Sequence, residues 1–458
     1  MNQAHCLSFI EQPFPSKLNP KIQSLFGSLK QNSFALLEST PQPFQTTTSK
    51  RLAVCFSGGP APGGHNVIVA IAKLCENHHN LFGVMGGFGG LIKGQLNPLT
   101  LADCESYYNV GGFDLLKTDR TKLTKQSHYD AIKQVVKQHQ LDAIIIIGGD
   151  DSQTNAIFLA DALAELSCSV IGVPKTIDGD LRYPPYLPIS FGFYSACDVY
   201  IELINNLIRD TQSIQKYWHF VKLMGRTSGH ITHYVGTKTK ADLFFLGEYL
   251  AKDSMTLSDL VKHIGDFILK STHNKKPYGV ICIPEGLLEW LPDIKQLING
   301  LHLDPAIRDS AMAFSSLSAT NKTILQQFPA YIQNQLLLER DAHGNIQLSR
   351  LETERLLIDL VKHYLAEQDP NFSFHGIPHF YGYEGRCTHP NSFDANFCTQ
   401  LGHIAGSLAL NGYTGYMAGI DPTHNPNQAY GIPIAQLLTH ETRNNNTVVV
   451  VKKTTVLN

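Results

Sequence analysis

Short apolar runs that alternate with helix-like segments constrain the fold of this chain more than any other feature. Four such runs lie at residues 52–56, 81–85, 143–147 and 169–173. Each ends in a turn rich in glycine or proline, and apolar residues recur at helical spacing between them. Strands that are apolar on both faces and alternate with amphipathic helices are typical of a parallel sheet covered on both sides. The sequence therefore predicts an α/β fold of the doubly wound class.

The pattern divides the chain into an extension and two domains. Residues 1–50 are rich in proline, serine and threonine, and we expect an N-terminal extension with one or two short helices there. Residues 51–215 are expected to form the first α/β domain. Residues 216–458 are expected to form the second, because a new series of apolar runs begins at Trp218. At about 300–370 the alternation stops, and this stretch predicts an inserted helical subdomain.

Charge and composition exclude several classes of protein. The formal net charge is −2, so a strongly basic chain that wraps nucleic acid is excluded. No apolar run approaches the roughly 18 residues that a membrane span needs, and residues 1–17 lack the pattern of a signal peptide. The nine cysteines are scattered, without a CxxC pair, as is typical of reduced thiols. We therefore expect a cytoplasmic protein with no nucleic-acid or membrane partner.

The first candidate functional loop is SGGPAPGGHN, which begins at Ser57 and lies between a predicted strand and a helix. Ligands of parallel sheets bind beyond the carboxyl ends of the strands, where this loop lies. Its glycines, including Gly58 and Gly59, would let the backbone approach an anion at a helix N-terminus. A tight structural turn explains the same glycines, so this loop alone leaves both possibilities open.

Two further loops carry charged side chains at the ends of neighbouring predicted strands. GGDDSQT contains Asp150 and Asp151, and a magnesium ion that holds phosphate oxygens needs one or two such carboxylates. PKTIDGD sets Lys175 near Asp178, where a lysine can neutralise a transferring phosphoryl group and an aspartate can take a hydroxyl proton. Helix capping and a salt-bridged surface loop are the structural alternatives. Together the three loops predict a phosphoryl-transfer site that has neither a Walker motif nor the protein-kinase motifs.

With these three loops the chain resembles the phosphofructokinase family, and within it the pyrophosphate-dependent branch of the long type. The motifs that carry the resemblance occur in the family's order: GGPAPGGHN, GGDDSQT, PKTIDGD, MGR, IPEG and GYEGR. The resemblance extends from Arg51 to the C-terminus. Long-type members usually continue well beyond the position of Asn458, so we expect a chain that is either truncated or has lost its terminal elements.

The resemblance implies two Rossmann-like domains with an inserted helical subdomain. It also implies an activity: reversible transfer of a phosphoryl group from pyrophosphate to the 1-hydroxyl of fructose 6-phosphate, with Mg²⁺ as cofactor. The partners implied are these two substrates and further copies of the chain, in a homodimer or higher homo-oligomer with shared active sites.

The resemblance also implies roles for the residues of the three loops. Gly58, Gly59 and Lys175 are implied to bind pyrophosphate, and Asp150 to hold the metal ion. Asp178 is implied to be the base that takes the proton from the 1-hydroxyl.

The residues implied to bind the sugar phosphate are Thr176, Ile177, Asp178, Lys216, Tyr217, Met224, Gly225, Arg226, Glu285, Tyr383, Glu384, Gly385 and Arg386. Within this set, Tyr383 and Arg386 are implied to hold the 6-phosphate. Lys216 and Tyr217 are implied to reach it from a neighbouring subunit. Many relatives have an arginine near Lys216, and a lysine offers a point charge in place of a bidentate fork.

Asp151 and Lys175 bear on the choice of phosphoryl donor. The ATP-using relatives have glycine at both positions. A carboxylate at Asp151 would repel the α-phosphate of a nucleotide, and Lys175 would neutralise charge on pyrophosphate. The alternatives are an ATP-dependent phosphofructokinase, a non-catalytic regulatory subunit of the pyrophosphate enzyme, and a lipid or NAD kinase that shares the GGD turn. The last would leave MGR, IPEG and GYEGR without a role.

Overall fold

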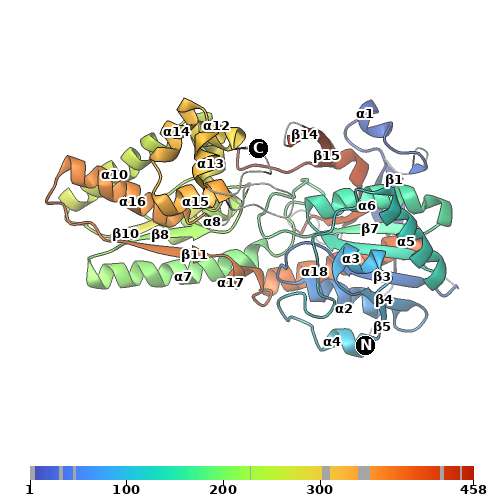
Figure 1. The fold of residues 1–458 in the computed structure, drawn as a ribbon. Helices are drawn as coiled ribbons and strands as arrows, with labels where there is room; N and C mark the ends of the chain where they lie inside the picture. Colours follow the sequence, from blue (N-terminus) through green and yellow to red (C-terminus); the bar gives the residue numbers. More distant parts are fainter. Residues whose placement is uncertain are drawn as a thin grey trace. The chain divides into compact units, whose positions relative to one another are not determined.

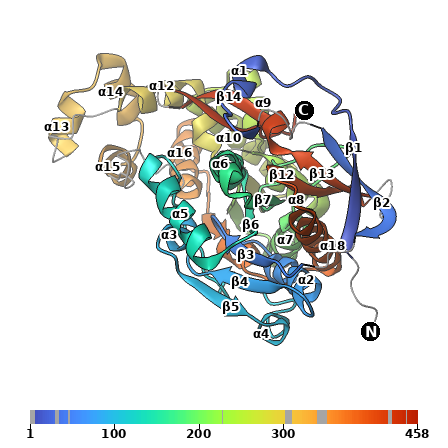
Figure 2. The same ribbon diagram turned by 90° about the vertical axis from the view of Figure 1, so that its right-hand side faces the viewer.

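The computed structural model describes residues 6–29, 35–44, 48–226, 228–301, 310–338, 351–422, 428–443 and 446–457. The chain forms two compact units. The first comprises Met1–Ala196 and Glu384–Thr454, and the second Cys197–Tyr383 and Thr455–Asn458. Figure 1 and Figure 2 label their elements from two directions.

Among the described residues, the first unit is built on a nine-stranded sheet (Figure 2). Its strands, in spatial order, are β1 (Cys6–Gln12), β2 (Leu36–Phe44), β13 (Ala429–Pro433), β12 (Tyr416–Ile420), β7 (Ser169–Pro174), β6 (Ala143–Gly148), β3 (Arg51–Phe56), β4 (Asn80–Val84) and β5 (Leu96–Leu99). The five strands from β12 to β4 are parallel, and antiparallel strands flank them. Every residue of β6 and β7 is buried, which explains their continuous apolar sequences.

Helices cover this sheet, and a two-stranded ribbon follows it. The helical elements are α1 (Pro20–Gln23), α2 (Gly64–Cys75), α3 (Gly87–Ile92), α4 (Leu101–Glu105), α5 (Gln126–His139), α6 (Asp150–Leu163), η2 (Ala164–Leu166), α18 (Ser392–Asn411) and η4 (Ile434–Leu437). The ribbon consists of β14 (Leu438–Arg443) and β15 (Asn446–Val451). Helix α7 (Phe193–Ile214) begins in the first unit and continues into the second.

The two units differ from the division expected from the sequence. Residues 384–454, which the sequence placed in the second domain, belong to the first unit, because β12 pairs with β7 and β13 pairs with β2. The N-terminal extension contributes α1 and also two strands, which we did not expect. Pro41 and Pro43 made β2 resemble a loop, but both lie beyond the residues that pair with β13.

The second unit is built on a parallel sheet in the order β11 (Gly376–Tyr381), β8 (Trp218–Leu223), β10 (Gly279–Pro284) and β9 (Leu243–Phe244). Its helices are α8 (His230–Thr239), α9 (Gly247–Lys252), α10 (Leu257–His273), α11 (Leu287–Trp290), α12 (Pro292–Gly300), α13 (Ser310–Ser315), α14 (Ala319–Gln326), α15 (Ala330–Leu338) and α16 (Thr353–Gln368). The region from 300 to 370, expected as a helical insert, contains α13 to α16. Apolar residues of α14, α15 and α16 join the core of this unit.

A buried ion pair fixes α16 to the sheet of the second unit. The Nζ of Lys222 in β8 lies 3.0 Å from Oε2 of Glu354, and it donates to the carbonyl oxygen of Leu351 at 2.8 Å. The two charged side chains are 4% and 7% exposed. Removal of one partner would leave the other charge buried and uncompensated.

We therefore expect Glu354→Ala to lower the free energy of unfolding by about 3–5 kcal/mol, measured by urea denaturation. Glu352→Ala is the matched control. Its ion pair with Arg355 joins side chains that are 41% and 58% exposed, and it should cost about 1 kcal/mol or less. Equal losses for the two variants would contradict the role assigned to the buried pair.

Candidate active site

The three loops singled out from the sequence lie along one edge of the first unit's sheet. They follow β3, β6 and β7, which are neighbouring parallel strands. The amide of Ser57 donates to the carbonyl oxygen of Ile147 at 2.9 Å, and that of Lys175 to Gly148 at 3.0 Å. The hydroxyl of Ser152 donates to Oγ of Ser57 at 2.8 Å. These hydrogen bonds hold the three loops to one another.

The glycines of the first loop give two cations room to approach the backbone. Gly58 has a φ of 82°, and a Cβ there would lie 3.5 Å from Nζ of Lys175. A Cβ at Gly59 would lie 3.0 Å from Cζ of Arg386. The amide of Gly58 donates to the carbonyl oxygen of Asp119 at 2.8 Å. Gly58 therefore offers an anion open space beside Lys175 rather than its own N–H group.

Lys175 is buried beneath this loop. Its side chain follows β7 and the residue is 7% exposed. Burial, reinforced by the positive charge of Arg386, lowers the pKa of Lys175 to about 8, while Asp178 and Asp150 oppose this shift. A dehydrated ammonium of this kind attracts an anion more strongly than an exposed one, because water screens it less.

The second loop places two carboxylates in the first turn of α6. Asp150 and Asp151 follow Gly149, which caps the helix without a side-chain hydrogen bond, so the carboxylates lie at the positive end of the helix dipole. Oδ2 of Asp150 is 3.1 Å from Nζ of Lys453. Oδ2 of Asp151 is 3.1 Å from Nζ of Lys122, and both of these side chains are about half exposed.

The third loop sets two more aspartates beside Asp150. The amide of Asp178 donates to Oγ1 of Thr176 at 3.0 Å, and Asp180 is 3% exposed. Burial raises the pKa of Asp178, although nearby cations, led by Lys453, oppose the shift. Burial and then the charge of Asp178 raise the pKa of Asp180 to about 7. The cluster thus combines three carboxylates with several cations, the composition expected around a charged substrate.

The acidic cluster also fits a divalent cation that is shared with phosphate. Within the described residues, no group of three or more His, Cys, Asp or Glu side chains forms a metal cage on its own. Mg²⁺ in phosphate chemistry needs only one or two carboxylates and keeps several waters. Asp150 supplies one carboxylate. The buried Oδ2 of Asp180 accepts no hydrogen bond from the described part of the chain, although Nζ of Lys453 lies 3.5 Å away, and it could supply another acceptor.

Four of the sugar-binding residues expected from the sequence come together at the carboxyl ends of two neighbouring strands in the second unit. Met224, Gly225 and Arg226 follow β8, and Glu285 follows β10. The amide of Gly225 donates to Oε2 of Glu285 at 3.1 Å. Nε of Arg226 donates to Oε1 of Glu289 at 3.0 Å. Glu285 and the MGR segment therefore form one connected group.

The GYEGR motif provides residues to both units. Tyr383 to Arg386 form the short helix α17, and the boundary between the units falls after Tyr383. Tyr383 is 66% exposed and belongs to the second unit. Arg386 lies in the first unit beside Gly59 and close enough to Lys175 to lower its pKa. The structure thus groups Arg386 with the loops that follow β3 and β7, which the sequence did not indicate.

Lys216 and Tyr217 lie at the opposite end of β8 from the MGR segment. Lys216 is exposed, and its Nζ is 5.4 Å from the ring centroid of Tyr217. Met224 lies eight positions after Lys216, which corresponds to about 26 Å of extended chain. The two segments of one chain therefore face different ends of the sheet.

Sequence reasoning missed two lysines of the first unit, Lys122 and Lys453, which pair with Asp151 and Asp150. Neither follows one of the strands that carry the predicted loops. Lys453 comes after β15, near the C-terminus, and no spacing in the sequence links it to Asp150. Only the fold brings them together.

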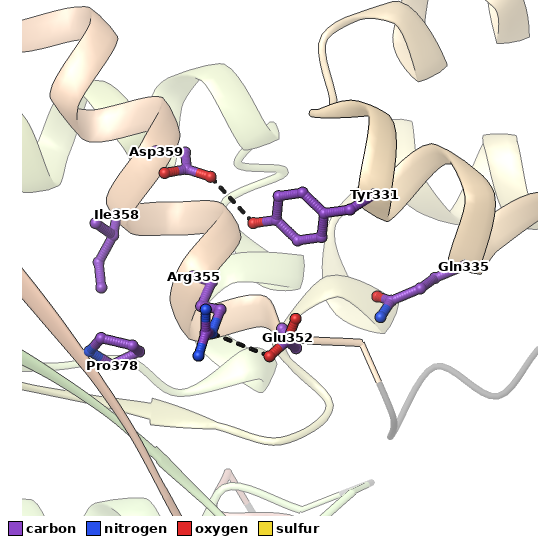
Figure 3. Close-up of a pocket in the computed structure, with 7 residues that line it drawn as sticks. All are labelled: Tyr331, Gln335, Glu352, Arg355, Ile358, Asp359 and Pro378. Atoms are coloured by element: carbon purple, nitrogen blue, oxygen red, sulfur yellow. Dashed lines mark hydrogen bonds and ion pairs between the residues drawn. The ribbon is translucent and has the colours of Figure 1, made fainter.

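A pocket of about 350 Å³ lies elsewhere in the second unit (Figure 3). Four of its polar side chains form two pairs. Nε of Arg355 donates to Glu352 at 3.0 Å, and the hydroxyl of Tyr331 donates to Asp359 at 3.1 Å. None of the residues that line it is among the predicted site residues. As for membranes, no helix in the described ranges is both long and apolar enough to cross one.

Comparison with known proteins identifies relatives over most of the chain. A pyrophosphate–fructose 6-phosphate 1-phosphotransferase of Treponema pallidum (strain Nichols) is 38% identical over 451 residues, which are 93% of this chain and 78% of the relative. The protein of the same name from Porphyromonas gingivalis is 39% identical over 428 residues, 88% of this chain and 78% of the relative.

Solved structures and a family model agree with these matches. The pyrophosphate-dependent phosphofructokinase of Nitrosospira multiformis superposes with a TM-score of 0.57 at 14% identity, covering 89% of this chain and 83% of that one. The phosphofructokinase of Saccharomyces cerevisiae gives 0.57 at 18% identity, over 81% and 43%. The predicted α/β fold is confirmed. The model of the family described as "Phosphofructokinase" matches residues 51–408. The chain belongs to the phosphofructokinase family.

Proposed function

We propose that this protein transfers a phosphoryl group reversibly from pyrophosphate to the 1-hydroxyl of fructose 6-phosphate, a step of glycolysis. The observation that carries the proposal is the grouping of Lys175, Asp178 and Asp150 at the ends of neighbouring parallel strands. The relatives from T. pallidum and P. gingivalis are named for this reaction. The first test is formation of fructose 1,6-bisphosphate and phosphate from the two substrates by the purified chain. Absence of product would reject the proposal.

In this mechanism Asp178 takes the proton of the attacking hydroxyl. The carboxylate accepts that proton as the oxygen attacks phosphorus, which avoids a free alkoxide or an oxonium intermediate. Lys453, Arg386 and Lys175 act to keep Asp178 ionised against the effect of burial. Lys175 faces the donor and neutralises charge on the pyrophosphate as its bond to the transferred group breaks.

Asp150, with Asp180 beside it, would hold a magnesium ion. When bound, such an ion neutralises phosphate oxygens and orients the donor for in-line transfer. Gly58 and Gly59 leave room for the donor against the loop, and Arg386 adds a guanidinium there. In the second unit, Glu285 and the MGR segment would bind sugar hydroxyls, with Thr176 and Ile177 lining the loop around Asp178. We place this activity in the cytoplasm, since the nine cysteines are all free thiols.

Two alternatives fit the residues less well. An ATP-dependent enzyme would have to accommodate a nucleotide next to Asp151. A non-catalytic subunit would have no need of Asp150 and Asp178, which are both present.

Lys175 gives the reaction an expected pH dependence. Because its pKa is lowered to about 8, the ammonium is present below that pH and is lost above it. We expect kcat/KM for pyrophosphate, which reports the free enzyme, to fall as pH rises through about 8. In Lys175→Arg the guanidinium stays charged, so the fall in kcat/KM should move to higher pH, even if kcat/KM itself is lower than in the wild type. Identical profiles for the two proteins would show that another group controls the alkaline limb.

Lys216 and Tyr217 suggest that active sites are shared between subunits of a homodimer or larger oligomer. The extended distance to Met224 prevents Lys216 from serving the MGR segment of its own chain. We therefore assign it to the 6-phosphate bound by a neighbouring copy, together with Tyr383. Lys216→Ala should chiefly raise KM for fructose 6-phosphate.

Mixing two variants tests this sharing. In a hybrid of Lys216→Ala and Asp178→Asn subunits, one site would carry both defects and the other would carry none. At low fructose 6-phosphate, co-refolded mixtures should therefore regain activity that neither parent shows. If each chain serves its own site, the mixture will give only the average of the two parents.

A further inference from the structure

The segment that follows β15 is hydrogen-bonded to residues that follow β7 in the first unit. The hydroxyl of Tyr183 donates to the carbonyl oxygen of Lys452 at 2.5 Å. The amide and the hydroxyl of Thr454 both donate to the carbonyl oxygen of Asp180, at 2.7 and 3.1 Å. The backbone is thus anchored on both sides of Lys453. This anchoring directs one particular side chain, that of Lys453, into the acidic cluster.

The ammonium of Lys453 bridges two of the carboxylates. Its Nζ lies 3.1 Å from Oδ2 of Asp150 and 3.5 Å from Oδ2 of Asp180, and its side chain is 27% exposed. The ammonium therefore contacts the carboxylate oxygen of Asp150, the residue that we propose as a metal ligand.

An ammonium and a metal ion cannot both lie at contact distance on the same carboxylate oxygen without strong repulsion. The flexible four-carbon stem of lysine lets the ammonium withdraw while its backbone stays anchored. The carboxylates, in turn, need a counter-charge when no metal is present, because buried like charges repel one another.

We propose that Lys453 is a positioning residue that holds Asp150 and Asp180 in the metal-free enzyme and must leave Asp150 when a divalent ion binds. Lys453 thereby sets the metal affinity of the donor site. The inference rests on the proposed function only in taking Asp150 as the metal ligand. The C-terminal segment is thus part of the donor site, although it lies far from the three loops in the sequence.

The test is the affinity of the full chain for Mg²⁺ alone, measured by titration calorimetry without substrates. If the Lys453 ammonium and Mg²⁺ exclude each other from Asp150, the ammonium weakens Mg²⁺ binding. Couplings between two such binding events typically change an affinity 5- to 150-fold. We expect Lys453→Met to bind Mg²⁺ about tenfold more tightly than the wild type. Lys453→Arg, which keeps the charge, should bind like the wild type. Lys452→Met is the matched control, since Lys452 is exposed on the same segment, and should change nothing.

Circular dichroism establishes that each variant is folded. Affinity for Mg²⁺ that is unchanged, weaker or undetectable in folded Lys453→Met would overturn the proposal. Because no substrate is present, this result is independent of the donor that the enzyme uses. Failure of pyrophosphate turnover by the wild type would reject the proposed function instead.

Discussion

Asp178→Asn is expected to lower kcat by about 10²–10⁴-fold while leaving KM for both substrates nearly unchanged. The amide has almost the shape of the carboxylate but cannot take up the proton of the 1-hydroxyl. The hydrogen bond from the Asp178 amide to Thr176 involves the backbone, so the loop should keep its conformation. Steady-state kinetics with pyrophosphate and fructose 6-phosphate, together with a thermal unfolding curve, give the required comparison.

Asp142→Asn provides the control for this substitution. Asp142 accepts a hydrogen bond from the amide of Arg51 at 2.7 Å, at the opposite end of β3 and β6 from the candidate site. An asparagine can accept the same bond, so turnover should stay near that of the wild type. Turnover of Asp178→Asn within a few-fold of this control would remove Asp178 from the role of base.

The double change Asp151→Gly with Lys175→Gly is expected to abolish most pyrophosphate activity and to give measurable ATP activity. Two unit charges about 4 Å apart interact by roughly 4 kcal/mol at an effective dielectric of about 20. A fraction of this repulsion between the Asp151 carboxylate and a nucleotide α-phosphate is enough to exclude ATP. Loss of a buried cation aimed at the transferred group typically costs about 10²–10³-fold. The measurement is kcat/KM for each donor.

The structure sharpens the expectation for the two single changes. Asp151 is half exposed and paired with Lys122, whereas Lys175 is buried. We expect Lys175→Gly alone to cause most of the loss with pyrophosphate, and Asp151→Gly alone to act mainly on ATP. Because both act on one bound anion, their effects should not add. An unchanged donor ratio in the double variant would show that donor choice lies elsewhere in the chain.

The sequence was sufficient to predict the central strands and the loops at their ends. The runs at 143–147 and 169–173 are apolar throughout because β6 and β7 are buried on both faces. Strands near the margin of the sheet carry no such signal. β2, which lies between the edge strand β1 and β13, contains two prolines and pairs with β13 over only two residues, so its sequence resembles a linker.

The sequence could not show which strands and side chains far apart in the chain become neighbours in the fold. Residues 384–454 return to the first unit because β12 adds to β7, and nothing local in either strand specifies the other as its neighbour. For the same reason Lys453 meets Asp150 without any motif that joins them. The motifs predicted those residues of the candidate site that directly follow a strand. Only the fold revealed Lys122 and Lys453, which pair with Asp151 and Asp150 from other parts of the chain.

The most direct test of the account is the ratio of kcat/KM for pyrophosphate to kcat/KM for ATP in the wild-type protein, measured with fructose 6-phosphate and Mg²⁺ at neutral pH. The charges of Asp151 and Lys175 predict a ratio far above one, with ATP turnover near the detection limit. A protein that prefers ATP, or that phosphorylates fructose 6-phosphate with neither donor, would contradict the account.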